Sequence, residues 1–424
     1  MPLDQEILVA DYRRHRSGGL RHRIMGTGRP CGKFRVMHIL SIPSWYADLD
    51  QGGTGRFFRD QALAMQRLGA VCGIIAPALG KSSSRTTLAD DPELPTLTRT
   101  ARAWGPRWPG RNEWFWVRAG RALFDDYVRI YGRPDVVHAH CCWPAGILAH
   151  AIAKREGIPY LVTEHRTNFA EGSLRSWQRR AARQVLSLAS ARIAVSPQLG
   201  SIMVAQFPDE MTDWHFVPNV LSATFQDCLI SPKDGTRPLT FLSVAHLGRR
   251  KNHDGLMRAF AKCFSGNARV RLEIVGEGGE RRSLQELAGS LGIAAQVSLL
   301  GALPIDQVRR RMELADAFVL ASKAETFGVV LIEALAAGLP IIATDCCGPD
   351  CIVRPENGLL VPPGSDGALA AALQEMAATI DRFDRHAIRA DALARYAPEV
   401  VGQILLRLAE SARQAPARPY SGMI

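Results

Sequence analysis

The sequence predicts an α/β protein of two domains, each built on a parallel β-sheet. The chain has 424 residues, which is more than one ordinary hydrophobic core holds. Short apolar runs of strand length alternate with longer segments of helical periodicity. The alternation is interrupted over residues 219–238, where periodic apolar residues are few. We therefore expect two sheets whose strand carboxyl ends face a central cleft.

The first domain is expected to span residues 34–218. Residues 1–33 lack periodicity and are rich in Arg and Gly, so we expect a disordered extension there. A strand at 35–42 leads into a glycine-containing loop, a helix from about 56 to 68 and a strand at 71–76. This opening is typical of a Rossmann-like domain.

Strands and helices continue to alternate up to residue 218. Residues 80–112 are polar and Pro-rich, and we expect them to be irregular. The further strands are expected at 135–138, 160–163, 192–195 and 215–217, and the further helices at 117–130, 146–155 and 174–190.

The second domain is expected to span residues 239–395, after the linker at 219–238. Its expected strands are 239–245, 270–275, 297–300, 317–320, 341–344 and 358–361, and its expected helices are 252–264, 280–291, 305–314, 327–337, 366–378 and 382–408. Residues 396–424 would form a C-terminal helix, placed to pack back on the first domain, and a disordered tail from Ala415.

Two acids occupy unusual places in the strand–helix–strand unit at 316–345. Glu325 follows directly on a buried strand, and Glu333 lies in an otherwise apolar helix. Seven residues lie between them, and this separation, taken as about two helical turns, would place them on roughly the same side. The helix start at Phe327-Gly328-Val329 offers free N–H groups for a phosphate.

These features indicate a ligand that carries phosphate and several hydroxyl groups. The hydroxyl groups would donate hydrogen bonds to the two carboxylates. The alternative interpretation makes Glu325 a solvated turn residue and Glu333 an exposed acid of an amphipathic helix. Spacing by itself does not decide between the two.

Composition narrows the class of protein. The chain is 47% hydrophobic and 22% charged, as in globular proteins, and no run of eighteen apolar residues is present to span a membrane. The arginine-rich start lacks the apolar stretch of a secretory signal. Nine cysteines without a CxxC pair indicate reduced cytosolic thiols. A zinc site at Cys346, Cys347 and Cys351 is the minor alternative, and Asp48-Leu49-Asp50 is not assigned a metal.

The net charge of +11 is concentrated in the first domain. Eight arginines between Arg99 and Arg133 are interleaved with aromatic residues. The aromatic residues are Trp104, Trp108, Trp114, Phe115 and Trp116, and the second basic run is Arg166, Arg175, Arg179, Arg180 and Arg183. Arg with Trp is typical of a surface that binds membrane headgroups. The alternative is a solvated helix face with Trp in the core. No motif for nucleic acid is present.

Basic and Gly-rich segments also end the first two strands of the second domain. Arg250 and Lys251 precede a helix start, where they could hold a diphosphate. Gly276-Glu277-Gly278 leaves space for a base or a phosphate. These groups would lie at the same sheet edge as Glu325 and Glu333.

These residues resemble glycosyltransferase family 4, retaining enzymes of the GT-B fold, over about residues 35–410. The resemblance is carried by these segments: IPSWY…GGTGRFFRDQA, the strand end VTEH, Lys251, Gly276-Glu277-Gly278, Glu325-Thr326-Phe327-Gly328, Glu333-Ala334, Gly338-Leu339-Pro340 and Asn357-Gly358-Leu359-Leu360-Val361. The combination of two Glu residues that have seven residues between them with the surrounding FG and AxGxP is the specific part.

The resemblance implies a role for each matching position. Lys251 would neutralise the leaving diphosphate, Glu325 would lie by the donor sugar, and Glu333 would bind the ribose. His165 would lie near the reacting sugar. The remaining donor-binding positions implied are Gly53, Gly55, Arg250, Gly276, Glu277, Phe327, Gly328 and Val329.

Two positions depart from the family pattern. His246 stands five residues before Lys251, where the family usually has an arginine, so Arg249 or Arg250 would have to supply that charge. Cys347-Gly348-Pro349-Asp350-Cys351 replaces a GG segment that is followed by a glutamate. His138 and His140 are further candidates for catalytic neighbours, although a histidine at a strand end is more often structural.

The resemblance implies a retaining glycosyltransferase, a hexosyltransferase, that needs no metal or other cofactor. It would move a sugar from a nucleotide sugar to a glycan or polyprenyl-diphosphate-linked acceptor in exopolysaccharide, capsule or lipopolysaccharide synthesis. The basic surface suggests a cytoplasmic enzyme that is peripherally bound to the inner leaflet of the inner membrane. The alternatives are a nucleotide-sugar epimerase and a non-catalytic nucleotide-sugar-binding protein. The donor's base and sugar, the acceptor, the start codon and the oligomeric state are not encoded in these motifs.

Overall fold

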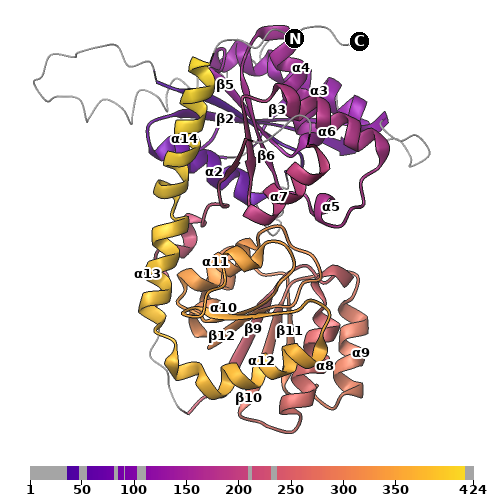
Figure 1. Ribbon diagram of the computed structural model, residues 1–424, viewed down its shortest axis with the longest axis vertical. Coiled ribbons are helices and arrows are strands. Elements are labelled where there is room, and N and C mark those ends of the chain that lie inside the picture. Colours follow the sequence, from indigo (N-terminus) through magenta and orange to yellow (C-terminus); the bar gives the residue numbers. More distant parts are fainter. Residues whose placement is uncertain are drawn as a thin grey trace, which may run out of the picture.

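The computed structural model describes residues 36–46, 55–80, 85–89, 91–102, 111–208, 213–230 and 236–415. Two α/β units lie one above the other along the long axis of the molecule (Figure 1). Several sequence predictions fall outside the described residues: the extension at 1–33, Asp48-Leu49-Asp50, Gly53, Trp104, Trp108 and the tail after Ala415.

The first sheet has eight strands among the described residues, in the order β3-β4-β2-β1-β5-β6-β7-β8. The strands are β1 (His38–Pro43), β2 (Val71–Gly80), β3 (Thr87–Leu88), β4 (Thr96–Arg102), β5 (Val136–His140), β6 (Tyr160–Glu164), β7 (Ala191–Ala194) and β8 (Trp214–Phe216). All pairs are parallel except β3 with β4. The central strands β5 and β6 are buried along their whole length, which is why they read as apolar runs.

Helices cover both faces of this sheet (Figure 1). They are α2 (Arg56–Arg67), α3 (Arg111–Tyr131), α4 (Ile147–Glu156), α5 (Thr167–Ala170), α6 (Ser176–Leu188) and α7 (Pro197–Gln206), with a π-helical turn at Cys142–Gly146. α3 begins six residues before the predicted start at 117. The short α5 and the helix α7 were not predicted.

The second sheet has six described strands, all parallel, in the order β11-β10-β9-β12-β13-β14. They are β9 (Leu239–Val244), β10 (Val270–Val275), β11 (Val297–Gly301), β12 (Ala317–Leu320), β13 (Ile341–Thr344) and β14 (Gly358–Val361). The two parallel-sheet units confirm the predicted fold class.

The helices of this unit follow the predicted alternation. They are α8 (His253–Phe264), α9 (Arg281–Ser290), α10 (Ile305–Leu314), α11 (Val329–Ala336), α12 (Asp366–Thr379), α13 (Arg385–Tyr396) and α14 (Pro398–Gln414). Short 3-10 turns lie at Ala223–Phe225, Arg249–Lys251, Pro349–Cys351 and Ile380–Arg382.

The prediction of an irregular segment at 80–112 was wrong in part, because it contains β3 and β4. β4 pairs with β2 in parallel from Thr96 to Arg102. Its sequence, TLTRTAR, is polar because only the short β3 flanks it on its other side. Edge strands need no continuous apolar run, so periodicity did not reveal this one.

The prediction of one helix over 382–408 was also wrong. Ala397 is extended and Pro398 begins a new helix, since proline lacks the N–H that would continue α13. The break lets the chain turn from the second unit to the first. α14 then runs along the upper unit, against α2 (Figure 1).

The chain crosses between the two units twice, and the two crossings are hydrogen-bonded to each other. The Leu221 N–H donates to the Tyr396 carbonyl at 2.9 Å. At the α14–α2 contact, Gly402 lies so close that an added Cβ would be 2.9 Å from the Ala64 carbonyl oxygen. The absence of a side chain at Gly402 therefore permits this close packing.

Replacing Gly402 with Ala tests the return packing. The new Cβ would overpack the α14–α2 contact, at a cost of about 1–3 kcal/mol, and oppose the gain in helix propensity of about 1 kcal/mol. Gly289→Ala in α9 is the matched control, because nothing lies within 4 Å of its Cβ position. We expect denaturant unfolding to show Gly402→Ala less stable than Gly289→Ala, and equal stabilities would contradict the packing described.

Candidate active site

The strand order locates the candidate site at the carboxyl edges of both sheets. In the second sheet the chain moves from β9 outward to β10 on one side and later to β12 on the other. In the first sheet β1 has the same position between β2 and β5. Ligands of open α/β sheets bind at such switch points, where neighbouring loops diverge.

An ion pair joins the two loops at the switch point of the second sheet. Lys251 ends the 3-10 turn after β9, and its Nζ lies 2.5 Å from Oε2 of Glu325 in the loop after β12. Both side chains retain some exposure, 21% and 16%. The Lys323 N–H also donates to the Arg250 carbonyl at 2.7 Å, which fixes the two loops to each other.

Glu325 belongs to a loop and not to the following helix. Gly328 is the N-cap of α11 with φ +96°, a left-handed conformation that suits glycine, and the helix begins at Val329. Glu325 precedes the helix and Glu333 lies within it, so the prediction that the two acids lie two helical turns apart is wrong. Phe327 is buried, so its side chain anchors the loop while its backbone borders the cleft.

The loop at 346–348 packs directly on this donor loop. A Cβ at Gly348 would lie 2.3 Å from the Phe327 nitrogen, so only glycine fits there. The neighbouring Cys347 has φ +93°, a strained conformation for a residue with a side chain. At this departure from the family's GG, Cys347 thus adopts a backbone conformation that favours glycine.

Glu333 lies half-buried on α11, within electrostatic reach of Asp60 and Arg56 of the first unit. Burial raises the pKa of Glu333 to about 8, and the charge of Asp60 on α2 raises it further while Arg56 opposes this. Burial also raises the pKa of Asp60 to about 6. Near neutral pH, Glu333 therefore holds its proton.

Gly276 and Gly278 allow the backbone after β10 to approach the loop after β9. A Cβ at Gly276 would lie 1.9 Å from the Ala245 carbonyl oxygen, and its φ is +143°. His246 contacts the Glu277 carbonyl through its Nδ1. Glu277 itself accepts from Arg281 at 2.8 Å and is half exposed. His246, which stands where the family usually has an arginine, thus binds the loop after β10.

Neither neighbouring arginine lies against Lys251. Arg249 is 91% exposed and faces Glu280 at 3.6 Å. Arg250 reaches the first unit, where its Nη1 donates to the Thr167 hydroxyl at 2.7 Å and lies 3.8 Å from Glu171. Arg250 therefore contributes a contact between the two units.

His165 lies at the end of β6, opposite the donor loop. Its Nε2 is 3.3 Å from Nδ1 of His140, at the end of β5. Phe57 and Phe58, from the first turn of α2, pack on its ring with centroids 5.0 and 5.2 Å away. Gly55 begins that turn with φ +94°, which brings α2 close to the histidine.

The histidines of this cluster are neutral at physiological pH. Burial lowers the pKa of His165 to about 3 and that of His138 to about 4, and it lowers the pKa of His140 well below the usual value. His138 contacts the Thr163 hydroxyl at 2.7 Å. A neutral His165 can donate from one nitrogen and accept at the other, so it can orient a sugar hydroxyl.

Glu164 is a functional residue that the sequence reasoning missed. Its fully buried carboxylate accepts backbone N–H groups of His165 and Arg166 at 2.9 and 2.8 Å through Oε1. Its Oε2 accepts the Cys142 N–H at 2.9 Å. Glu164 therefore joins the ends of β5 and β6 and holds the backbone of His165. The available signal was a charged residue closing an apolar strand.

Thr326, between Glu325 and Phe327, is the second missed residue. Its hydroxyl donates to the His165 carbonyl at 2.8 Å, from one unit to the other. Ser196 makes a similar bond to the Cys347 carbonyl at 3.1 Å. Together with Arg250, these bonds bring His165 and the Lys251–Glu325 pair to the same cleft.

Within the described residues, no cysteine forms a disulfide. The eight cysteines within the described ranges are all free, and burial raises the pKa of Cys346 and Cys347 to about 11. In the part of the chain that the structure covers, no group of three or more His, Cys, Asp or Glu side chains could hold a metal ion.

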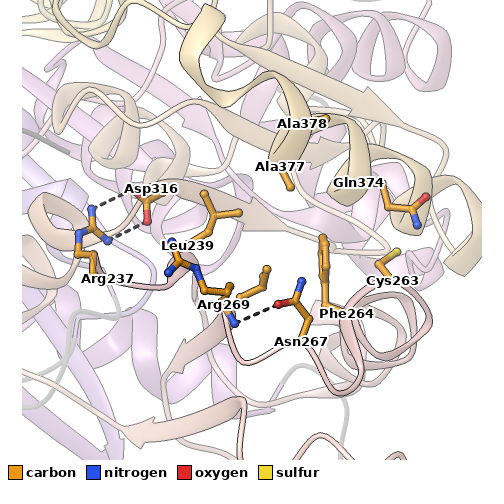
Figure 2. Close-up of a pocket in the computed structure, with 11 residues that line it drawn as sticks. Arg237, Leu239, Cys263, Phe264, Asn267, Arg269, Asp316, Gln374, Ala377 and Ala378 are labelled. Atoms are coloured by element: carbon orange, nitrogen blue, oxygen red, sulfur yellow. Dashed lines mark hydrogen bonds and ion pairs between the residues drawn. The ribbon is translucent and has the colours of Figure 1, made fainter. Parts of the chain in front are cut away.

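A separate cavity of about 580 Å³ lies at the opposite edge of the second sheet (Figure 2). It lies where β9, β10 and β12 begin, near Leu239, Val270 and Asp316. Arg237 from the linker binds Asp316 with two contacts of 2.8 Å. These contacts hold the linker against the start of β12, so the cavity lies beside a contact that stabilises the fold.

Comparison with known proteins agrees with this geometry. The family model "Glycosyltransferase Family 4" matches residues 51–223, and "Glycosyl transferases group 1" matches residues 231–388. The Bacillus subtilis teichuronic acid biosynthesis glycosyltransferase TuaC is 25% identical, over 80% of this chain and 88% of TuaC. A Mycobacterium tuberculosis glycogen synthase is 27% identical, over 80% of this chain and 86% of its own length.

Solved structures share the fold. Sucrose-phosphate synthase from Thermosynechococcus elongatus superposes with a TM-score of 0.73 at 21% identity, covering 88% of this chain and 98% of that one. Anabaena HepE in complex with UDP superposes with a TM-score of 0.68 at 17% identity, covering 88% and 100%. With both halves matched by family models and the GT-B architecture in place, the chain belongs to the group 1, family 4 glycosyltransferases.

Proposed function

We propose that the protein transfers a hexose from a nucleotide sugar to a glycan or lipid-linked acceptor, with retention of anomeric configuration. The observation that carries this proposal is the Lys251–Glu325 pair at the switch point of the second sheet, opposite His165. HepE has been solved with UDP-glucose, which supports a nucleotide sugar as the donor class.

The donor diphosphate would be bound by positive groups on the second unit. Lys251 supplies a full charge, and the start of α11 at Val329 supplies backbone N–H groups and a positive dipole end. On binding, Lys251 would exchange Glu325 for phosphate oxygens, which frees the Glu325 carboxylate to accept sugar hydroxyls. Glu333 lies four residues along α11, within reach of the ribose.

Front-face transfer fits these groups best. The bond between the sugar's anomeric carbon and the diphosphate oxygen breaks, and a bond to the acceptor oxygen forms on the same face. The acceptor's proton passes to an oxygen of the departing diphosphate. Lys251 and the α11 N-terminus stabilise the charge that develops there, so we infer that this chemistry needs no metal.

A role in cell-surface polysaccharide synthesis is supported by the relatives. TuaC is a teichuronic acid biosynthesis enzyme, and an outer core lipopolysaccharide galactosyltransferase, WaaB, shares the fold with a TM-score of 0.63. We infer a cytoplasmic enzyme that binds the inner leaflet peripherally and accepts a polyprenyl-diphosphate-linked glycan.

A basic surface on the first unit supports the membrane contact. α3 and α6 lie on the same side of the sheet, on either side of α4 (Figure 1). Trp114 of α3 is 55% exposed, with Arg118 5.7 Å above its ring, and Arg180 and Arg183 of α6 are exposed. Trp116 is buried, so this tryptophan belongs to the core. No helix in the described ranges is long and apolar enough to cross a membrane.

Lys251→Ala tests the leaving-group role. Loss of the cation removes stabilisation of the developing charge, and we expect turnover with a nucleotide-sugar donor to fall by about 10²–10³-fold. Donors are first found by thermal shift, because a bound donor raises the unfolding temperature. Lys262→Ala on the exposed side of α8 is the control. Full turnover in Lys251→Ala would refute the assignment.

The Glu333 carboxyl makes stability depend on pH. Its pKa, raised from 4.5 to about 8 in the fold, means that the folded protein retains a proton that the unfolded chain has lost. The unfolding free energy should therefore fall as pH rises from 7 to 8.5. In this window, the buried histidines are neutral in the folded state, and the protons that the unfolded chain still binds at histidine near pH 7 are the same in wild type and in both variants. We expect the decline to be shallower in Glu333→Gln than in wild type or in Glu286→Gln, and parallel curves in all three would contradict the buried acid.

Charge reversal on α6 tests the membrane surface. We expect Arg179→Glu, Arg180→Glu and Arg183→Glu together to weaken binding to vesicles containing phosphatidylglycerol at least 100-fold, since each cation contributes about 1 kcal/mol. A triple reversal of the exposed Arg271, Arg282 and Arg310 on the second unit carries the same charge change as a control. Equal weakening in both triples would mean that net charge, and not this surface, drives vesicle binding.

A further inference from the structure

We propose that Thr326 is a positioning residue, which aligns His165 with the donor loop across the cleft. This inference rests on the proposed function, since His165 is taken to act on the donor sugar. Thr326 belongs to the second unit and lies between Glu325 and Phe327, whereas His165 directly follows β6 of the first unit. The Thr326 side chain thus connects the donor loop to His165.

The backbone of His165 is held from both units. Its N–H donates to the Glu164 carboxylate at 2.9 Å, within the first unit. Its carbonyl accepts the Thr326 hydroxyl at 2.8 Å, from the second unit. The ring is held by His140 and by the α2 phenylalanines. Among the described contacts of His165, the hydrogen bond from the Thr326 hydroxyl is therefore the one whose length depends on how the two units are placed.

The contact is well shielded, and Thr326 itself is held firmly. Thr326 is 5% and His165 7% exposed, so water competes little for the hydroxyl. On the far side, Gly348 packs against the Thr326 carbonyl group, where a Cβ would lie 2.3 Å away. The donor loop therefore cannot shift freely at Thr326, and a displacement of this loop would be passed to His165.

The chemical consequence is a link between donor binding and the alignment of His165. A donor that binds Lys251 and the α11 N-terminus would settle the loop that carries Thr326. His165 then has its full set of contacts only while the donor loop is in place. Opening of the cleft breaks the Thr326 bond, which leaves His165 fixed from the first unit alone. Small misplacements of a catalytic group can lower rates by up to about 10²-fold.

The test compares Thr326→Val, Thr326→Ser and the control Thr240→Val. Valine keeps the shape of threonine and removes the hydroxyl, and serine restores it. Thr240, at the other edge of the same sheet, donates its hydroxyl to the Pro238 carbonyl at 3.2 Å. We expect Thr326→Val to lower kcat about 10-fold while KM for the donor stays within about twofold. Thr326→Ser should recover most of kcat, and Thr240→Val should retain it.

A second readout does not depend on turnover. In protein labelled with ¹⁵N at histidine, the ring resonances of His165, assigned with His165→Asn, should shift in Thr326→Val and not in Thr240→Val. The result that overturns the inference is a kcat within twofold of wild type in Thr326→Val, or unchanged His165 resonances. If the wild-type protein turns over no nucleotide sugar, the proposed function is wrong, and the Thr326–His165 contact then has no role in catalysis. An altered His165 resonance would then support the structural link by itself.

Discussion

The direction of the parallel strands is the constraint on which the rest of the structure depends. A strand–helix–strand unit returns each loop to the same sheet edge, so chemically active residues collect there without being near in sequence. In the second unit this brings Lys251 to Glu325, and in the first it brings His140 to His165. The two crossings of the chain at Leu221 and Tyr396 then hold the edges face to face.

The charged groups around the candidate site compensate one another. Lys251 is paired with Glu325, Glu333 retains a proton, and the three histidines are neutral. Uncompensated charge is costly away from water. A diphosphate would replace Glu325 as the partner of Lys251, so ligand binding and the charge of the site are linked.

The sequence predicted the elements whose residues carry their own signal. Buried strands such as β12 are continuous apolar runs, and the acids Glu325 and Glu333 were conspicuous within one unit. β4 was missed because an edge strand tolerates Thr and Arg. The helical spacing of the two acids was misjudged because Gly328 delays the start of α11 to Val329. Glu164 and Thr326 were not predicted as site residues because their partners are backbone groups, in the case of Thr326 on a residue 161 positions away. Such contacts leave no pattern in the local sequence.

The central claim is that the donor diphosphate binds at the carboxyl edge of the second sheet. A crystal structure with a nucleoside diphosphate tests it most directly, because the molecule offers a second cavity at the opposite edge, beside Arg237 and Asp316 (Figure 2). We expect the diphosphate against Lys251 Nζ and the backbone N–H groups at Val329, with the Lys251–Glu325 pair separated. A nucleotide found beside Arg237, or one at the cleft with Lys251 still bound to Glu325, would contradict the account.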